Sequence, residues 1–126
     1  MNDALIIDDN RQTADALKQM LNALGIPARV AYGSTPAVEV LGAFTPGLIL
    51  LDINMPGADG TEVLAYIQRE PRLKTAPVIV ITSDDQFETR QRVMQGGALA
   101  MLIKPATIDT LEATLDRAGI LKKYSK

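Results

Sequence analysis

Short apolar runs alternate along the chain with longer segments in which apolar residues recur every three or four positions. Continuous apolar runs of four or five residues are typical of strands that are buried on both faces of a sheet. The run VIVI at 78–81 is also rich in β-branched residues, which favour strands. The pattern predicts strands over residues 4–7, 28–32, 48–51, 77–81 and 99–103.

The longer segments have the spacing of amphipathic helices. In the first of them, Leu17, Leu21 and Leu24 recur at helical intervals, and Gly25 follows at a position where helices commonly end. Pro71 ends a later segment in the same way, since proline cannot continue a helix. The pattern predicts helices over residues 11–24, 35–43, 61–69, 87–95 and 107–118.

Strands and helices therefore alternate strictly, without an internal repeat, a low-complexity tract or a linker. Strict alternation is typical of a parallel sheet with helices on both faces. We predict one α/β domain of five strands and five helices over residues 1–126. Residues 119–126, which include the stretch ILKKYSK, are either a C-terminal tail at the end of the last helix or the stub of a linker.

Composition excludes several kinds of chemistry. The 126 residues include no cysteine and no histidine, so disulfides, thiol nucleophiles, histidine acid–base catalysis and imidazole metal ligands are all ruled out. The net charge of −2 gives no electrostatic footprint for nucleic acid. The N-terminus lacks the pattern of a signal peptide, and no apolar stretch reaches the roughly 20 residues of a membrane span. We expect a soluble, cytoplasmic domain that contacts neither nucleic acid nor membrane directly.

Polar residues follow four of the five predicted strands. In an open parallel sheet, ligands bind beyond the carboxyl ends of the strands, where the strand order reverses. Neighbouring strands would bring these polar side chains together at one edge. They are Asp8 and Asp9, Asp52, Thr82 with Ser83, and Lys104 with Pro105.

Three carboxylates at one edge would repel one another and raise each other's pKa values. A divalent cation resolves this repulsion, and without histidine or cysteine its ligands must be oxygen atoms, which favours magnesium, calcium or manganese. Lys104 adds a second positive charge. The set is suited to hold Mg²⁺ and to receive a dianionic group near Asp52, as in phosphoryl transfer to a carboxylate.

Each of these residues also has an ordinary structural role when it is considered alone. An acidic or amide residue within 8–10 can cap the first helix, and Asp52 can open a turn into 56–57. Thr82 and Lys104 are unremarkable at strand ends. Their joint placement after neighbouring strands favours a functional site over these separate roles.

The chain resembles the receiver domain of two-component response regulators from residue 3 to about residue 118. The resemblance rests on the order and spacing of LIIDDN, LILLDINMPGADG, VIVITSDD and MLIKPAT, which contain the acidic, threonine and lysine positions named above. It implies a flavodoxin-like, doubly wound sheet with strand order 2-1-3-4-5. It also implies a signalling domain that catalyses only its own phosphorylation and dephosphorylation, and no other enzymatic activity.

The resemblance implies a role for each acidic residue. Asp52 is the phosphoacceptor, which takes a phosphoryl group from the phosphohistidine of a sensor histidine kinase or phosphotransfer protein. Asp9 and Asp52 bind Mg²⁺ directly, Asp8 acts largely through water, and the backbone carbonyl of Asn54 is a further ligand. Asn54 and Asp84 influence how fast the phosphoryl group is hydrolysed.

The other site residues contact or surround the phosphoryl group. Lys104 pairs with it, and Thr82 donates a hydrogen bond that draws the following loop inward. The bond between Lys104 and Pro105 is expected to be cis. Phosphorylation then shifts a two-state equilibrium that a downstream protein reads on the face of the fourth helix, fifth strand and fifth helix. A homodimer through the same face is left open.

Two positions depart from the family pattern. Met101 stands where receivers usually carry a tyrosine or phenylalanine that moves when the threonine moves, so a tyrosine hydroxyl is not available there. Ala106 stands where a bulkier residue, often phenylalanine, follows the Lys-Pro pair, and we expect this to affect local packing.

Two other functions compete with the phosphorylated switch. One is a scaffold that uses the receiver fold without phosphorylation; the missing aromatic residue favours it, whereas the complete acidic set opposes it. The other is an aspartate-nucleophile phosphatase, which would need a second aspartate where the chain has Asn54. No phosphate-binding glycine motif of nucleotide-binding proteins is present.

Overall fold

A five-stranded parallel sheet forms the centre of the molecule. The computed structural model describes residues 2–55 and 58–125, so the turn expected at 56–57 lies outside the described residues. The sheet has the order β2-β1-β3-β6-β7, which confirms the predicted order 2-1-3-4-5 when its five strands are numbered along the chain. Its strands are β1 (Ala4–Ile7), β2 (Ala28–Ala31), β3 (Leu48–Leu51), β6 (Val78–Thr82) and β7 (Ala100–Ile103).

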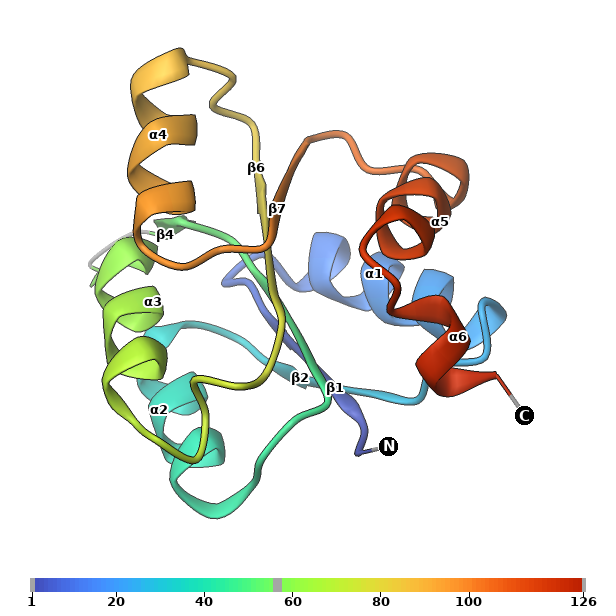
Figure 1. The fold of residues 1–126 in the computed structure, drawn as a ribbon, viewed down its shortest axis with the longest axis horizontal. Coiled ribbons are helices and arrows are strands. Elements are labelled where there is room, and N and C mark those ends of the chain that lie inside the picture. The colour runs from blue at the N-terminus through green and yellow to red at the C-terminus, as the bar shows by residue number, and fades with distance from the viewer. Residues whose placement is uncertain (1, 56–57, 126) are drawn as a thin grey trace.

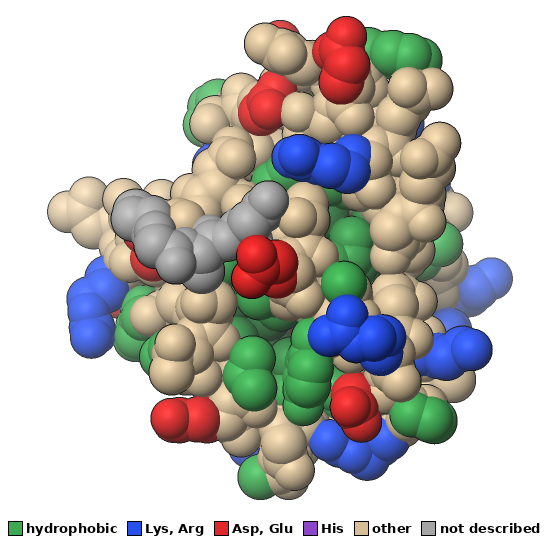
Figure 2. Space-filling view, turned by 90° about the vertical axis from the view of Figure 1, so that its left-hand side faces the viewer, with side chains coloured by type: hydrophobic (Ala, Val, Ile, Leu, Met, Phe, Trp, Pro, Cys, Tyr) green, Lys and Arg blue, Asp and Glu red, His purple; other side chains and the backbone are tan. Residues whose placement is uncertain are grey.

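Helices cover both faces of the sheet. In Figure 1, α2, α3 and α4 lie on one side of the sheet, and α1, α5 and α6 lie on the other. The helices are α1 (Arg11–Ala23), α2 (Ser34–Ala43), α3 (Gly60–Arg69), α4 (Phe87–Gln95), α5 (Ile108–Arg117) and α6 (Leu121–Tyr124). On the face shown in Figure 2, acidic and basic side chains are interspersed, with apolar side chains exposed between them. None of the helices in the described ranges is long and apolar enough to cross a membrane.

The two sides of the sheet hold two apolar cores. All residues of β1, β3 and β6 are buried, as expected from their continuous apolar runs. Alternate strand residues pack on opposite faces, so Leu5 and Ile7 join the core under α2, α3 and α4, whereas Ala4 and Ile6 join the core under α1 and α5. Burial on both faces fixes the strands that carry the acidic residues.

All five predicted helices are present, and the described residues contain a sixth that was not predicted. Gly119 adopts a positive φ of 75° and ends α5, so the chain turns back instead of extending away. Ile120 is buried, and Tyr124 packs on the core beneath α1 and α5. The helix α6 is a single turn, and one turn is too short to produce a periodic pattern. A two-stranded antiparallel pair, β4 (Asn54–Met55) and β5 (Ala58–Asp59), was also not predicted.

Replacing Tyr124 with phenylalanine is expected to lower the free energy of unfolding by about 1 kcal/mol. The Tyr124 hydroxyl donates a hydrogen bond of 2.7 Å to the backbone carbonyl of Asn2, which ties α6 to the N-terminus. Urea denaturation at neutral pH measures the loss. Tyr66→Phe is the matched control, since the Tyr66 hydroxyl forms no hydrogen bond within the described residues.

The contribution of Tyr124 to stability is expected to decrease at high pH. Burial, together with the nearby Asp3 carboxylate, raises the pKa of Tyr124 to about 12 from 10.0. The unfolded chain therefore loses the phenol proton first, and the contribution of Tyr124 to stability falls as the pH rises from 10.0 toward about 12. The difference between wild type and Tyr124→Phe should shrink over that range. A constant difference would contradict the raised pKa of Tyr124.

Candidate functional site

Asp8 and Asp52 lie side by side because the strands before them are in register. Ile7 of β1 pairs with Leu51 of β3, so the next residue on each strand reaches the same edge. The hydrogen-bond ladder continues through these residues: the Asp52 N–H donates to the Ile7 carbonyl at 2.9 Å, and the Asp8 N–H donates to the Ala31 carbonyl at 3.2 Å. The sheet thus fixes the backbone of both acidic residues.

The structure brings the three predicted carboxylates together. One carboxylate oxygen from each of Asp8, Asp9 and Asp52 lies within 4.8 Å of the other two. Asp8 is 1% exposed and Asp52 is 5% exposed, whereas Asp9 faces solvent. Asn10, rather than an aspartate, caps α1 by accepting a hydrogen bond from the Thr13 N–H at 3.0 Å. The carboxylates are therefore free of the capping role, and the all-oxygen set fits a hard divalent cation.

Lys104 bridges two of the three carboxylates. Its Nζ lies 3.1 Å from Oδ2 of Asp8 and 3.5 Å from Oδ2 of Asp52. The backbone N–H of Lys104 donates to the Thr82 carbonyl at 2.8 Å, which continues the pairing of β6 with β7. The peptide bond between Lys104 and Pro105 is cis. The charge of Lys104 is thus placed between two buried carboxylates that would otherwise repel each other.

Opposing effects act on the ionisation of Asp52. Burial raises the pKa of its carboxyl group, and the nearby Asp8 carboxylate raises it further. The Asn54 N–H, which donates to Oδ1 of Asp52 at 3.0 Å, and the Lys104 ammonium both lower the pKa. The net effect is a raised pKa, which means that the folded domain disfavours the ionised form of Asp52.

Thr82 connects the loops that follow β3 and β6. The side chain of Thr82 is fully buried, and its Oγ1 accepts hydrogen bonds from Nδ2 of Asn54 at 2.8 Å and from the Asp84 N–H at 3.1 Å. Asp84 in turn accepts a bond of 2.6 Å from the Thr89 hydroxyl, which is the main reason that its pKa is lowered. The sequence singled out Asn54, Thr82 and Asp84, but it gave no signal for Thr89.

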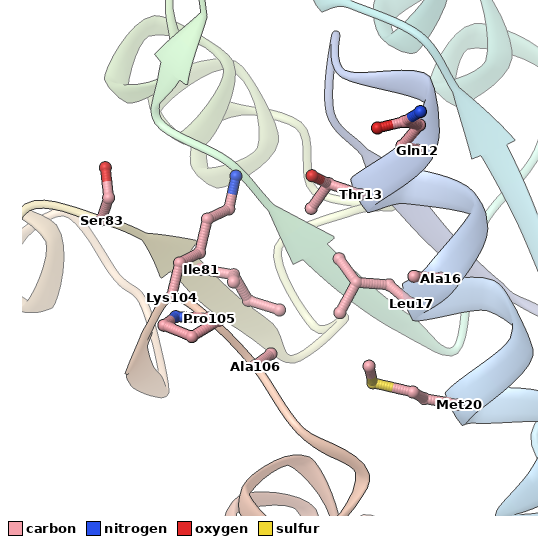
Figure 3. A pocket seen from close by; sticks show the side chains of 10 residues that line it. All are labelled: Gln12, Thr13, Ala16, Leu17, Met20, Ile81, Ser83, Lys104, Pro105 and Ala106. Carbon is pink, nitrogen blue, oxygen red and sulfur yellow. The ribbon is translucent and has the colours of Figure 1, made fainter.

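A mainly apolar groove lies beside Lys104, between α1 and the segment after β7. Its volume is about 530 Å³. Figure 3 shows Leu17 and Met20 on α1 facing Ile81 and Ala106 across the groove, with Lys104 nearby. Ala106 is one of the residues that line this groove. Met101, the other departure, is half-buried and packs on the core beneath α2, α3 and α4.

Comparison with known proteins places these features in a family. The protein-family model of the response regulator receiver domain matches residues 4–116 of this chain. The probable methanogenesis regulatory protein FilR2 of Methanothrix harundinacea is 29% identical over 95% of this chain and 81% of its own length.

Solved structures agree with this assignment. Chemotaxis protein CheY4 of Vibrio cholerae has a TM-score of 0.87 and 25% identity, over 94% of this chain and 98% of that protein. A response regulator of Burkholderia pseudomallei, solved with a phosphorylated aspartic acid, a calcium ion and citrate, has a TM-score of 0.84 and 25% identity, over 98% of this chain and 72% of that one. Since the family model spans most of the sequence, this chain belongs to the response regulator receiver domains, the signalling domains of two-component systems.

Proposed function

We propose that this domain is a signalling switch in which Asp52 accepts a phosphoryl group from the phosphohistidine of a sensor histidine kinase or phosphotransfer protein. The observation that carries the proposal is the buried Asp52 carboxylate with the Lys104 ammonium 3.5 Å away and two further carboxylates within 4.8 Å. The phosphorylated aspartic acid in the Burkholderia pseudomallei regulator supports it. The function implies the cytoplasm as the site of action.

The chemistry is a transfer between two nucleophiles. An oxygen of the Asp52 carboxylate attacks phosphorus, the P–N bond of the donor breaks, and the electron pair stays on the histidine nitrogen, which takes a proton from water. The product is an acyl phosphate on Asp52. Lys104 offsets the negative charge of the phosphoryl oxygens, and the Thr82 hydroxyl donates a hydrogen bond to one of them.

The acidic set would hold Mg²⁺. We assign the ligands to the carboxylates of Asp9 and Asp52 and the backbone carbonyl of Asn54, with Asp8 acting largely through water. A bound Mg²⁺ would neutralise negative charge on the carboxylates and on the incoming phosphoryl group. Asn54 and Asp84 flank the site, where their polar side chains would influence the attack of water on the acyl phosphate.

The output surface is the face formed by α4, β7 and α5. Its exposed apolar side chains include Phe87 at 66% and Leu99 at 48%. A hollow on this face is lined by Met94 and Leu99 and by the cations Arg90 and Arg117. We propose that a downstream protein with apolar and acidic side chains, or a second copy of the domain, binds there. The competing function, a scaffold that needs no phosphorylation, is favoured by Met101 alone.

Phosphorylation by acetyl phosphate is expected to depend on magnesium. With Mg²⁺, intact mass spectrometry should show one added phosphoryl group, and chelation by EDTA should slow its appearance by about 100-fold. Reduction with borohydride and peptide mapping should locate the acyl phosphate at Asp52. Adding Mg²⁺ back in excess should restore the rate.

Three results would count against the switch. An adduct that forms equally fast in EDTA would contradict the metal assignment. An adduct that maps to a serine or threonine would contradict the phosphoacceptor. If no adduct forms and beryllofluoride does not bind, the scaffold function is favoured instead.

A further inference from the structure

A continuous chain of hydrogen bonds ties helix α4 to the loop beside Asp52. Asn54, two residues after Asp52, donates from Nδ2 to Oγ1 of Thr82 at 2.8 Å. The Asp84 N–H donates to the same oxygen at 3.1 Å. Thr89, in the first turn of α4, donates its hydroxyl proton to Oδ2 of Asp84 at 2.6 Å. The chain of bonds therefore runs from the loop after β3 to the N-terminal turn of α4.

Asp84 is fastened to the start of α4 at two points. Its Oδ1 accepts the Gln86 N–H at 3.0 Å, while its Oδ2 accepts the Thr89 hydroxyl. Thr89 is 7% exposed, whereas Asp84 is partly exposed, so the bond is shielded from water on the Thr89 side. A displacement of Asp84 must therefore either move the first turn of α4 or break the bond to Thr89.

Phosphorylation of Asp52 would act on this series of hydrogen bonds at Thr82. The Thr82 hydroxyl oxygen already accepts two hydrogen bonds, so its own proton is available to a phosphoryl oxygen on Asp52. When the hydroxyl turns toward that oxygen, its lone pairs turn away from the Asp84 N–H. The Asp84 N–H is part-buried in this bond, so the loss of its acceptor is costly and the Asp84 segment is expected to move.

Met101 on β7 provides no comparable hydrogen-bonded connection from Thr82 to the output face. Met101 on β7 is half-buried and packs on the core, and its side chain has no hydrogen-bond donor. A methionine side chain adapts to several packings, so its position is only weakly coupled to that of Thr82.

We propose that Thr89 is a positioning residue that couples Thr82 to helix α4 through Asp84, and that this bond carries the state of Asp52 to the output face. The proposal rests on the phosphorylation of Asp52 proposed above. Coupling of this kind requires that α4 has two arrangements that both ends of the chain of bonds bias, which exchange measurements on α4 detect.

Hydrogen–deuterium exchange of α4 tests the proposal with beryllofluoride and Mg²⁺ as the probe. In wild type, exchange over residues 87–95 should change on addition of the probe. In Thr89→Val, which keeps the shape but lacks the hydroxyl, the change should shrink by at least about fivefold. Thr89→Ser should restore it. Fluorine NMR should show that both variants still bind the probe.

Two control variants separate coupling from stability. Thr114→Val removes a hydroxyl from another buried helical threonine, which donates to the Thr110 carbonyl at 2.8 Å on α5, and it should leave the α4 response intact. Met101→Leu should also leave the response intact.

Distinct results overturn the proposal in distinct ways. A full α4 response in Thr89→Val, or a response lost in Met101→Leu, overturns the coupling role of Thr89 while the proposed function stands. Loss of probe binding in Thr89→Val alone assigns Thr89 to the site itself and also overturns that role. Failure of wild type to bind the probe overturns the proposed function together with the coupling.

Discussion

Replacing Asp52 with asparagine is expected to abolish phosphoryl uptake and, at the same time, to stabilise the metal-free domain. Asparagine has nearly the same shape as aspartate but lacks the nucleophilic carboxylate. We therefore expect the rate of phosphorylation by acetyl phosphate with Mg²⁺ to fall by about 10³-fold or more. Intact mass spectrometry over time measures this loss.

The gain in stability is expected because the folded domain disfavours the ionised form of Asp52. Burial, opposed in part by the Asn54 N–H and by Lys104, leaves the pKa of Asp52 raised. A raised pKa in the folded state means that folding is favoured at low pH and that this advantage is lost as the pH rises through the folded pKa. At pH 7 the ionised carboxylate thus costs stability, and asparagine removes that cost. Lys104 keeps its partner Asp8, at 3.1 Å, in the variant.

Thermal unfolding in EDTA at pH 7 should show a higher Tm for Asp52→Asn than for wild type. Added Mg²⁺ should narrow or reverse the difference, because it binds the folded wild type more tightly than the variant. Asp116→Asn, on the exposed surface of α5, is the matched control and should change neither property. A lower Tm for Asp52→Asn in EDTA would show that the carboxylate stabilises the metal-free fold. That result would contradict the inference that ionised Asp52 destabilises it.

Much of this site could be predicted from the sequence because its residues follow buried strands. The apolar runs of β1 and β3 predict the strands, and a parallel sheet brings their carboxyl ends to one edge, so Asp8 and Asp52 lie close together because β1 and β3 are neighbours. The periodicity alone did not give the order of the strands, which came from the family resemblance. Periodicity identifies an element but does not identify its neighbour in the sheet.

The features that the sequence did not reveal depend on short elements or on single side chains. A one-turn helix such as α6 has no period to detect, and β4 and β5 have two residues each. Thr89 resembles any other helical threonine until the fold places it 2.6 Å from Asp84. The groove beside Lys104 depends on which side chains α1 turns toward the segment after β7, and this requires three-dimensional packing.

Gly60 offers a second prediction of large effect, because it lies against the backbone of Asp52 and Ile53. It is the first residue of α3, and its N–H donates to the Ile53 carbonyl at 3.0 Å. A Cβ at this position would lie 2.3 Å from Cα of Ile53 and 2.6 Å from the carbonyl oxygen of Asp52. Both neighbours are backbone atoms, so the loop after β3 must move to accept even a methyl group.

Gly60→Ala is therefore expected to lower the free energy of unfolding by about 3 kcal/mol, as measured by urea denaturation. The folded fraction should also be phosphorylated more slowly by acetyl phosphate, by about tenfold or more, because the displaced loop carries Asp52 away from Lys104. Both effects share one cause, so they should appear together. If stability falls but the phosphorylation rate does not, then α3 has moved to relieve the steric contact and the loop that carries Asp52 has not.

Gly42→Ala tests whether the loss at Gly60 comes from steric contact or from the helical setting alone. Gly42 lies within α2 and is exposed, and a Cβ added to it would meet no atom within 4 Å. Alanine is the better helix former, so this variant should be more stable than wild type by about 0.5–1 kcal/mol and should be phosphorylated normally. Opposite signs for the same substitution at two helical glycines would establish that Gly60 is required because the Asp52 loop packs against it. Stabilisation by both substitutions would remove that argument, since the helix preference of alanine would then account for both variants.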